Sequence, residues 1–113
     1  MSLALRQSDD FLADLRKQVD WYRDHASPEI AERYVNAVEA ALRKLAETPG
    51  LGRPRFRDWP ELAGIHSWRA LRPYQRHLIF YRFDDQTLWV ERILHGARDL
   101  LRRLRQPPYA DGA

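Results

Sequence analysis

Residues 74–99 read YQRHLIFYRFDDQTLWVERILHGARD, and this stretch decides the fold. Two runs rich in branched and aromatic residues, 77–83 and 88–94, flank the polar residues DDQT at 84–87, a pattern that predicts a β-hairpin. Because side chains alternate across a strand, the first run places apolar groups on both of its faces. We therefore expect cover on both sides of the sheet, with helices of the same chain on one face and a C-terminal helix or a partner on the other.

The sequence before the hairpin predicts two helices. Ser8 is a suitable N-cap, acidic residues follow it, and apolar residues then recur every three or four positions as far as about His25. Ser27 and Pro28 begin a second amphipathic helix, which ends at Pro49. The short joint between them makes an antiparallel αα-hairpin, whose apolar stripes suit one face of the sheet.

The remaining segments supply further strands, a loop and a last helix. Residues 3–7 alternate as a weak edge strand, and residues 51–64 read as a loop with a short extended piece around 55–57. Residues 65–71 predict a strand antiparallel to the hairpin, and residues 97–104 a short helix.

Together these elements predict an α+β fold with two layers. It contains an N-terminal strand, an αα-hairpin, an antiparallel sheet of three further strands and a short C-terminal helix. We expect a single domain over residues 1–106 and a flexible tail over residues 107–113.

The composition excludes several classes of protein. Cysteine is absent from the 113 residues, which removes disulfides and thiolate chemistry. The sequence shows no basic-then-apolar leader and no apolar run approaching about 18 residues, so we expect a cytoplasmic protein without a membrane span. The histidines lack further ligands at a metal-binding spacing, and the five glycines are scattered. We therefore expect no metal and no cofactor.

Positive charge is concentrated in the second half of the chain. Residues 1–50 hold 7 Lys and Arg against 9 Asp and Glu, whereas residues 51–113 hold 12 Arg against 7 acids. Arg forms planar forks with phosphates and carboxylates, so this excess indicates an acidic partner, either nucleic acid or an acidic polypeptide. A codon bias toward Arg explains the preference over Lys equally well, but not its position in the chain.

The arginines of the predicted sheet are the main candidates for binding. Neighbouring strands carry four of them, a turn carries one and the start of the last helix another: Arg69, Arg76, Arg82, Arg92, Arg72 and Arg98. Such a group can grip phosphates or an acidic chain. The alternative is a solvated face with salt bridges to Glu91, Asp84 and Asp85, and the sequence leaves both possibilities open.

The apolar residues predict a protein partner. Of the four tryptophans we assign Trp21 and Trp68 to the core, and Trp59 and Trp89 to partner contacts. We expect the short final helix to be too small to cover the second face of the sheet. The partner should then contribute an amphipathic helix and an extended acidic segment.

Two motifs are specific when taken together, FYR at 80–82 and HGARD at 95–99. They accompany, in order, Asp14-Leu15, Tyr22, Ala31, Tyr34, Leu42, Leu45, Pro49, Gly52-Arg53, Tyr74 and Arg76. Over residues 3–104 this pattern resembles the ParE branch of the RelE/ParE toxin superfamily. The resemblance implies a toxin of a type II toxin-antitoxin (plasmid stabilisation) module, with a β-α-α-β-β-β core in which the first strand pairs with the last.

Within that superfamily the resemblance implies one of two activities. ParE-like members inhibit DNA gyrase without a catalytic centre, whereas RelE-like members cleave mRNA on the ribosome, using basic residues and a Tyr close after the last strand. Here Leu100 and Leu101 occupy that region, and Tyr109 lies too far along the chain. We therefore expect a gyrase inhibitor that a cognate antitoxin neutralises, with a ribosome-dependent mRNA endonuclease as the alternative.

Site residues are assigned on this basis. Target binding is assigned to Arg69, Arg72, Arg76, Arg82 and Arg98. The alternative endonuclease would use Arg76, Arg82, His95 and Arg98. The lasting affinity for the antitoxin is assigned to Tyr74, Trp89 and Leu101.

Overall fold

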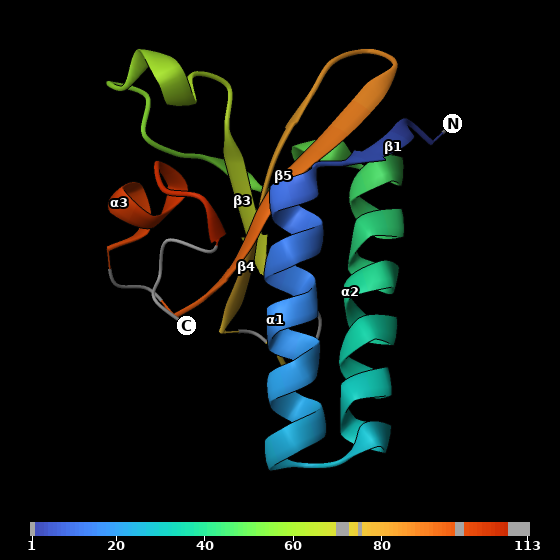
Figure 1. Cartoon of the computed structure of the whole chain (residues 1–113). Coiled ribbons are helices and arrows are strands. Elements are labelled where there is room, and N and C mark those ends of the chain that lie inside the picture. Colours follow the sequence, from blue (N-terminus) through green and yellow to red (C-terminus); the bar gives the residue numbers. More distant parts are fainter. Residues whose placement is uncertain (1, 70–72, 75, 97–98, 109–113) are drawn as a thin grey trace.

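Five strands form one mixed sheet in the order β1-β5-β4-β3-β2 (Figure 1). The computed structural model describes residues 2–69, 73–74, 76–96 and 99–108. Its elements are β1 (Ala4–Gln7), α1 (Asp9–His25), α2 (Pro28–Glu47), β2 (Arg53–Pro54), β3 (His66–Arg69), β4 (His77–Phe83), β5 (Thr87–His95) and α3 (Leu100–Leu104). The predicted α+β fold is confirmed. The extended piece of the loop lies slightly earlier than predicted, at β2, where it pairs with β3.

The predicted hairpin is formed by β4 and β5. Asp84 closes its turn, because the carboxylate accepts hydrogen bonds from the backbone N–H groups of Gln86 and Thr87, each at 2.8 Å. These bonds favour the charged carboxylate and lower the pKa of Asp84. A polar side chain, rather than a glycine, thus sets the turn.

A β-bulge at Glu91 changes which side chains of β5 face the helices. The pairing with β4 shifts by one residue between Val90 and Arg92, which leaves Glu91 as the extra residue. Val90 and Ile93 therefore both pack in the core beneath the helices, although strict alternation would place them on opposite faces.

The first strand lies beside the last, as the resemblance implied. β1 runs parallel to β5, with Ala4 opposite Thr87 and Gln7 opposite Val90. Ser8 follows immediately and joins this sheet to α1. Its side-chain oxygen accepts a hydrogen bond from the N–H of Phe11 at 2.9 Å and donates one to a backbone carbonyl of β5 at 2.8 Å.

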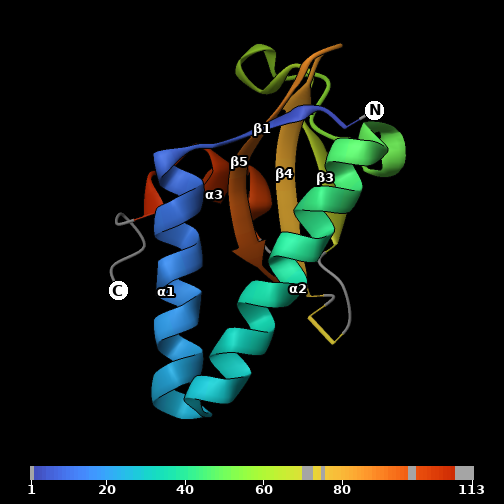
Figure 2. The same ribbon diagram turned by 90° about the vertical axis from the view of Figure 1, so that its right-hand side faces the viewer.

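The helices α1 and α2 cover one face of the sheet, the helix face (Figure 2). Ser27 caps α2 through the N–H of Ile30 at 3.1 Å, which confirms the second predicted helix start. All of the largest fully buried side chains except Phe80 belong to the main core, and they come mainly from α2, β4 and β5: Phe11, Tyr34, Val38, Leu45, Ile79, Tyr81, Leu88 and Val90. Burial of this apolar surface contributes most of the free energy that holds the two layers together.

The opposite face, the outer face, is covered by α3 together with residues 56–65. Sheet residues and covering residues form a second buried cluster: Leu62, Ile65, Leu78, Phe80, Leu94 and Leu100. The final helix is indeed short, but our expectation of a large uncovered area on this face is wrong. The loop before β3 folds over the sheet and, with α3, buries Leu78, Phe80 and Leu94, while Trp89 stays exposed.

The tryptophans divide differently from the prediction. Trp59 and Trp89 are exposed, at 38% and 40%, and Trp68 packs against the main core. Trp21, which we assigned to the core, is 52% exposed. Its ring stacks on His25 of the same helix at 4.7 Å between centroids, while its neighbour Tyr22 takes the position that faces the main core.

Gly52 makes the closest backbone approach to the core. Its N–H donates to the hydroxyl of Tyr81 at 2.9 Å, and that hydroxyl donates to the carbonyl of Pro49 at 2.6 Å. A Cβ added at Gly52 would lie 2.5 Å from the Tyr81 hydroxyl and 2.8 Å from the carbonyl oxygen of Ser67. The position therefore has no space for a side chain.

Gly52→Ala should lower the free energy of unfolding by about 1–3 kcal/mol, because the backbone must move away from Tyr81 to accept the methyl group. Urea denaturation measures this change. Gly50→Ala is the matched control, since nothing lies within 4 Å of a Cβ at Gly50. Equal stability of the two variants would contradict the tight packing at Gly52.

The C-terminal residues of the described part reach back to the helical layer. Pro107 is half-buried and Pro108 is buried. Residues 109–113 lie outside the described residues, so the domain boundary after 106 and the flexible tail stay predictions. No helix in the described part of the chain is long and apolar enough to cross a membrane.

Candidate binding surface

The outer face carries the arginines of the sheet. The pairing places Arg6 beside Trp89 in β5, and Trp89 beside Arg82 in β4. Side chains two residues apart on a strand lie on the same face, so Arg82 faces the same side as Phe80 and Leu78, which pack on the outer face. Arg6, Trp89 and Arg82 therefore point away from α1 and α2. A hollow of about 300 Å³ opens here, lined by Arg6, Gln7, Ser8, Arg82, Trp89, Val90 and Glu91.

Arg82 is held in place by two contacts. Its Nη1 lies 3.3 Å from a carboxylate oxygen of Glu91, and its Nη2 donates to the backbone carbonyl of Glu61 at 2.8 Å. Burial raises the pKa of Glu91, and the positive charge of Arg82 opposes that shift. The Nε of Arg82 is buried without a hydrogen-bond partner among the described residues. The guanidinium is thus oriented, with one donor unused.

Glu61, which accepts from Arg82, links this site to a second exposed tryptophan, Trp59. The carboxylate of Glu61 pairs with Arg105 at 3.2 Å, and the guanidinium of Arg105 lies 5.1 Å from the ring centre of Trp59. We call the whole set, Arg6, Trp59, Glu61, Arg82, Trp89, Glu91 and Arg105, the Trp-Arg surface. The pair of Glu61 with Arg105 is exposed and adds little stability, whereas the pair of Arg82 with Glu91 is half-buried.

Arg92, which we grouped with the binding arginines, is instead a structural residue. It is 4% exposed, and its Nε and Nη2 donate to the carboxylate of Asp14 at 2.7 and 2.9 Å. Its Nη1 donates to the carbonyls of Arg103 and Gln106 at 2.9 and 2.6 Å. This side chain joins α1, β5 and the end of α3, and a partner cannot reach it.

The remaining target-binding candidates do not form one group. Arg69 pairs with Leu78 at one end of the sheet, and Arg76 precedes β4 at that same end. Both are exposed. Arg82 lies four residues beyond Leu78, or about 13 Å along the strand. Arg72 and Arg98 lie outside the described residues.

The residues of the alternative endonuclease are also separated. His95 pairs with His77 at the start of β4, whereas Arg82 is five residues further along that strand, or about 17 Å. The ring of His95 lies 4.8 Å from that of His77 on the helix face, while Arg82 points to the outer face. Arg76 is near His95, since its carbonyl accepts from the N–H of Gly96 at 2.9 Å. Arg82 and His95 therefore cannot act together on one phosphodiester.

His77 lies in an aromatic cluster that sequence reasoning missed. It is 3% exposed, and the hydroxyls of Tyr22 and Tyr34 lie 3.3 and 3.2 Å from its two ring nitrogens. Burial, and to a smaller extent the nearby His95, lowers the pKa of His77 to about 4. The imidazole is therefore neutral at pH 7. The sequence of β4 gave no sign of these hydrogen bonds, because the two tyrosines that form them with His77 come from α1 and α2.

Of the three residues predicted to anchor the antitoxin, Trp89 alone is exposed to a partner. Tyr74 is 9% exposed and packs edge-on against Tyr22 and Tyr34 in the main core, so it serves folding rather than an exposed contact. Leu101 is half-buried against the second cluster. Trp89 is exposed at the centre of the Trp-Arg surface. We did not assign its neighbour Arg6 to a site. The sequence signal for Arg6 was its polar position in the predicted edge strand.

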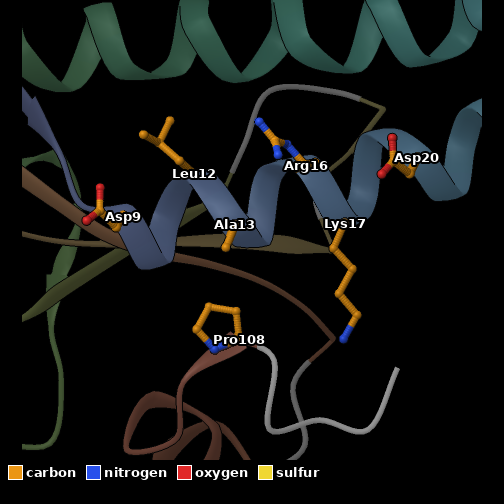
Figure 3. Close-up of a pocket in the computed structure, with 7 residues that line it drawn as sticks. All are labelled: Asp9, Leu12, Ala13, Arg16, Lys17, Asp20 and Pro108. Atoms are coloured by element: carbon orange, nitrogen blue, oxygen red, sulfur yellow. The ribbon is translucent and has the colours of Figure 1, made fainter.

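A larger hollow, of about 520 Å³, lies along α1, away from these arginines (Figure 3). Pro108 lies across from Ala13, and Lys17 extends along the same side of the helix. Asp9 and Asp20 balance Arg16 and Lys17 around it, so it has no net charge. Within the residues that the structure describes, no three His, Asp or Glu side chains group as a metal site. We see no catalytic arrangement in this hollow.

Comparison with known proteins identifies the family. A family model described as the ParE toxin of the type II toxin-antitoxin system parDE matches residues 5–100, and the chain belongs to this family of toxins. The chromosomal ParDE toxin-antitoxin system from P. aeruginosa has a similar structure, with a TM-score of 0.68 and 20% identity, over 85% of this chain and 98% of that one. No curated protein sequence matches the chain significantly.

The fold is also similar to a mutant of the E. coli toxin RelE in the free state. That comparison gives a TM-score of 0.57 and 14% identity, with both chains covered completely. At these identities the two structures support the RelE/ParE-like fold alone.

Proposed function

We propose that this chain is a toxin that inhibits DNA gyrase by binding, and that a cognate antitoxin in the same cytoplasm neutralises it. The observation that carries the proposal is the Trp-Arg surface, where the exposed ring of Trp89 lies between Arg6 and Arg82. Exposed tryptophans and arginines are the side chains that most often dominate binding energy at protein interfaces. Membership of the ParE family supports gyrase as the target.

The separation of the basic residues supports inhibition by binding over RNA cleavage. Cleavage of a phosphodiester needs a base, an acid and cations around one phosphate. Arg82 and His95 lie at opposite ends and on opposite faces of the sheet. Leu100, close after the last strand, is buried and offers no proton donor. A surface that binds a protein needs no such convergence.

The target and the antitoxin are assigned different parts of the outer face. Arg69 and Arg76, exposed at the far end, are proposed to contact the target. Trp89 is proposed to anchor the antitoxin. Arg82 lies beside Trp89, so an antitoxin bound there also covers this target-binding residue.

Supercoiling of relaxed plasmid by purified gyrase tests the proposal. We expect the protein to inhibit the reaction, and the antitoxin encoded in the neighbouring reading frame to restore it. Trp89→Ala should raise the antitoxin concentration needed for that rescue by about 30-fold, the effect of removing an interface hot spot of about 2 kcal/mol. Trp21→Ala is the matched control, because Trp21 is at least as exposed as Trp89 but lies on α1.

Two results would reject the proposal. Undisturbed gyrase together with ribosome-dependent cleavage of mRNA would make the chain an endonuclease. Undisturbed gyrase without cleavage, and harmless expression in a bacterial host, would leave it a binding module without toxicity. Equal rescue of the Trp89 and Trp21 variants would remove Trp89 from the antitoxin site while leaving gyrase inhibition standing.

A further inference from the structure

Three arginines gather at the edge of the sheet formed by β2 and β3, away from the Trp-Arg surface. Arg53 in β2 lies opposite Ser67 in β3, and Arg69 follows two residues later on the same face. Arg55 lies just beyond β2, where its N–H donates to the carbonyl of Ile65 at 3.0 Å. Its Nη1 then reaches back to the hydroxyl of Ser67 at 3.0 Å. Sequence reasoning placed Arg53 and Arg55 in a loop and missed this grouping.

Their positive charges repel one another. Burial lowers the pKa of Arg55, and the charges of Arg53 and Arg69 lower it further. In the part of the chain that the structure describes, no carboxylate forms an ion pair with Arg53 or Arg55. Bringing these like charges together costs free energy, and a bound anion would offset that cost.

The hollow beside these arginines selects the kind of anion. Its volume is about 240 Å³, and Leu51, Arg53, Ser67, Trp68, Arg69 and Leu78 line it. That volume is below the usual range for pockets that hold a small-molecule ligand, but it admits a side-chain carboxylate. Leu51 is 41% exposed and provides an apolar contact next to the charges. The site therefore suits an acidic side chain next to an apolar one.

A nucleotide fits this site less well. Binding of single-stranded nucleic acid relies on aromatic rings that are free to stack on bases. Trp68 is among the residues that line the hollow, but its ring packs against the main core, with its centre 5.9 Å from the ammonium of Lys44 on α2. Its ring is thus already engaged on the other side of the sheet. The ring beside Arg55 is that of Phe56, 5.3 Å from the guanidinium, and it is partly buried against the second cluster.

We propose that Arg53, Arg55 and Arg69 form a binding site for a carboxylate of an acidic, partly apolar peptide segment. This inference rests on the proposed function, because the segment is then supplied by the antitoxin. β2 is the edge of the sheet, so an extended chain can approach it from outside. The site is separate from Trp89 but shares Arg69 with the proposed target contact. The antitoxin would therefore hold the toxin at two places on the outer face and cover Arg69 as well as Arg82.

The test uses a synthetic peptide of Ser-Glu-Leu-Glu repeats, its Ser-Gln-Leu-Gln counterpart and an oligouridylate of matched charge. Titration calorimetry at low salt should show binding of the acidic peptide and at least tenfold weaker binding by Arg53→Gln/Arg55→Gln. Arg33→Gln/Arg43→Gln carries the same loss of charge on the exposed side of α2, and its affinity should stay within twofold of the unmodified chain. Arg53→Gln alone should weaken binding at least threefold, which keeps the test valid if the double variant unfolds.

The outcomes separate this inference from the proposed function. Equal loss in both double variants would mean attraction to net charge alone, and absence of peptide binding would reject the site. Tighter binding of the oligouridylate, abolished by Arg53→Gln, would make it a phosphate site and also overturn the proposal. None of these results depends on gyrase, so inhibition of supercoiling can stand while the carboxylate site fails.

Discussion

Asp14→Ala should lower the free energy of unfolding by about 3–5 kcal/mol, because it leaves the guanidinium of Arg92 buried without its counter-charge. The pair is 93–95% shielded from solvent at the side-chain level, at a closest distance of 2.7 Å. The same carboxylate also accepts from the backbone N–H of Ile93 at 3.1 Å. One substitution therefore removes the counter-charge and an acceptor for the strand at once.

Guanidinium denaturation measures the loss. Asp20→Ala is the control, since Asp20 forms an exposed pair with Arg23 and its removal should change stability by no more than about 0.5 kcal/mol. Replacing both partners, as Asp14→Leu with Arg92→Met, should recover a large part of the loss, because no charge is then left buried. A loss below about 1 kcal/mol in Asp14→Ala would contradict the structural role given to Arg92.

Acid should destabilise the protein between about pH 6.5 and pH 4 through His77. The folded protein holds this histidine neutral, whereas the unfolded chain takes up a proton below its ordinary pKa of 6.5. The unfolded state thus binds more protons in this window, so stability is fully present above it and falls as pH decreases through it. The shift from 6.5 to about 4 corresponds to about 3 kcal/mol.

Burial disfavours the charged form, and the hydrogen bonds of His77 suit the neutral one. A neutral imidazole donates through one nitrogen and accepts through the other, so one of Tyr22 and Tyr34 can accept while the second donates. Protonation turns both nitrogens into donors, so the tyrosine hydroxyl that had donated to the ring must rotate its hydrogen away and loses that acceptor.

The measurement is the urea midpoint at several pH values for the unmodified chain and for His77→Gln. Gln is neutral throughout, so its curve should be flatter between pH 6.5 and 4 even if the variant is less stable overall. Glu91, whose pKa is raised, acts with the opposite sign and is common to both proteins. Parallel pH profiles would show that His77 titrates equally in the folded and unfolded chain.

Local signals in the sequence were enough for most of the fold. Ser8 and Ser27 start their helices by capping backbone N–H groups a few residues away, and the hairpin turn is set by Asp84 bonding to its own neighbours. Such interactions connect residues close in the chain, so their pattern is visible in the sequence. The apolar stripe of α2 is likewise visible in the sequence, because its residues recur every three or four positions.

The parts that the sequence did not predict depend on distant partners. Asp14 occupies the polar side of the predicted helix and is buried only because Arg92, far along the chain, meets it. The outer face needed less cover from a partner than expected, because the loop containing Leu62 and Ile65 folds over it. The grouping of Arg55 with Arg69 depends on the pairing of β2 with β3, which so short a strand does not reveal in the sequence.

The pairing of β1 with β5 has a consequence for synthesis of the chain. Ala4 is synthesised long before its partner Thr87, because the two helices and the other strands lie between them in the chain. The two helices can form and pair while the chain is growing, because their contacts are local, but the sheet cannot close before β5 has left the ribosome. The Trp-Arg surface, which includes Arg6 and Trp89 on these two strands, thus arises only after β5 has been made. A chain that stops before β5 would lack the strand that joins β1 to β4, and with it this binding surface.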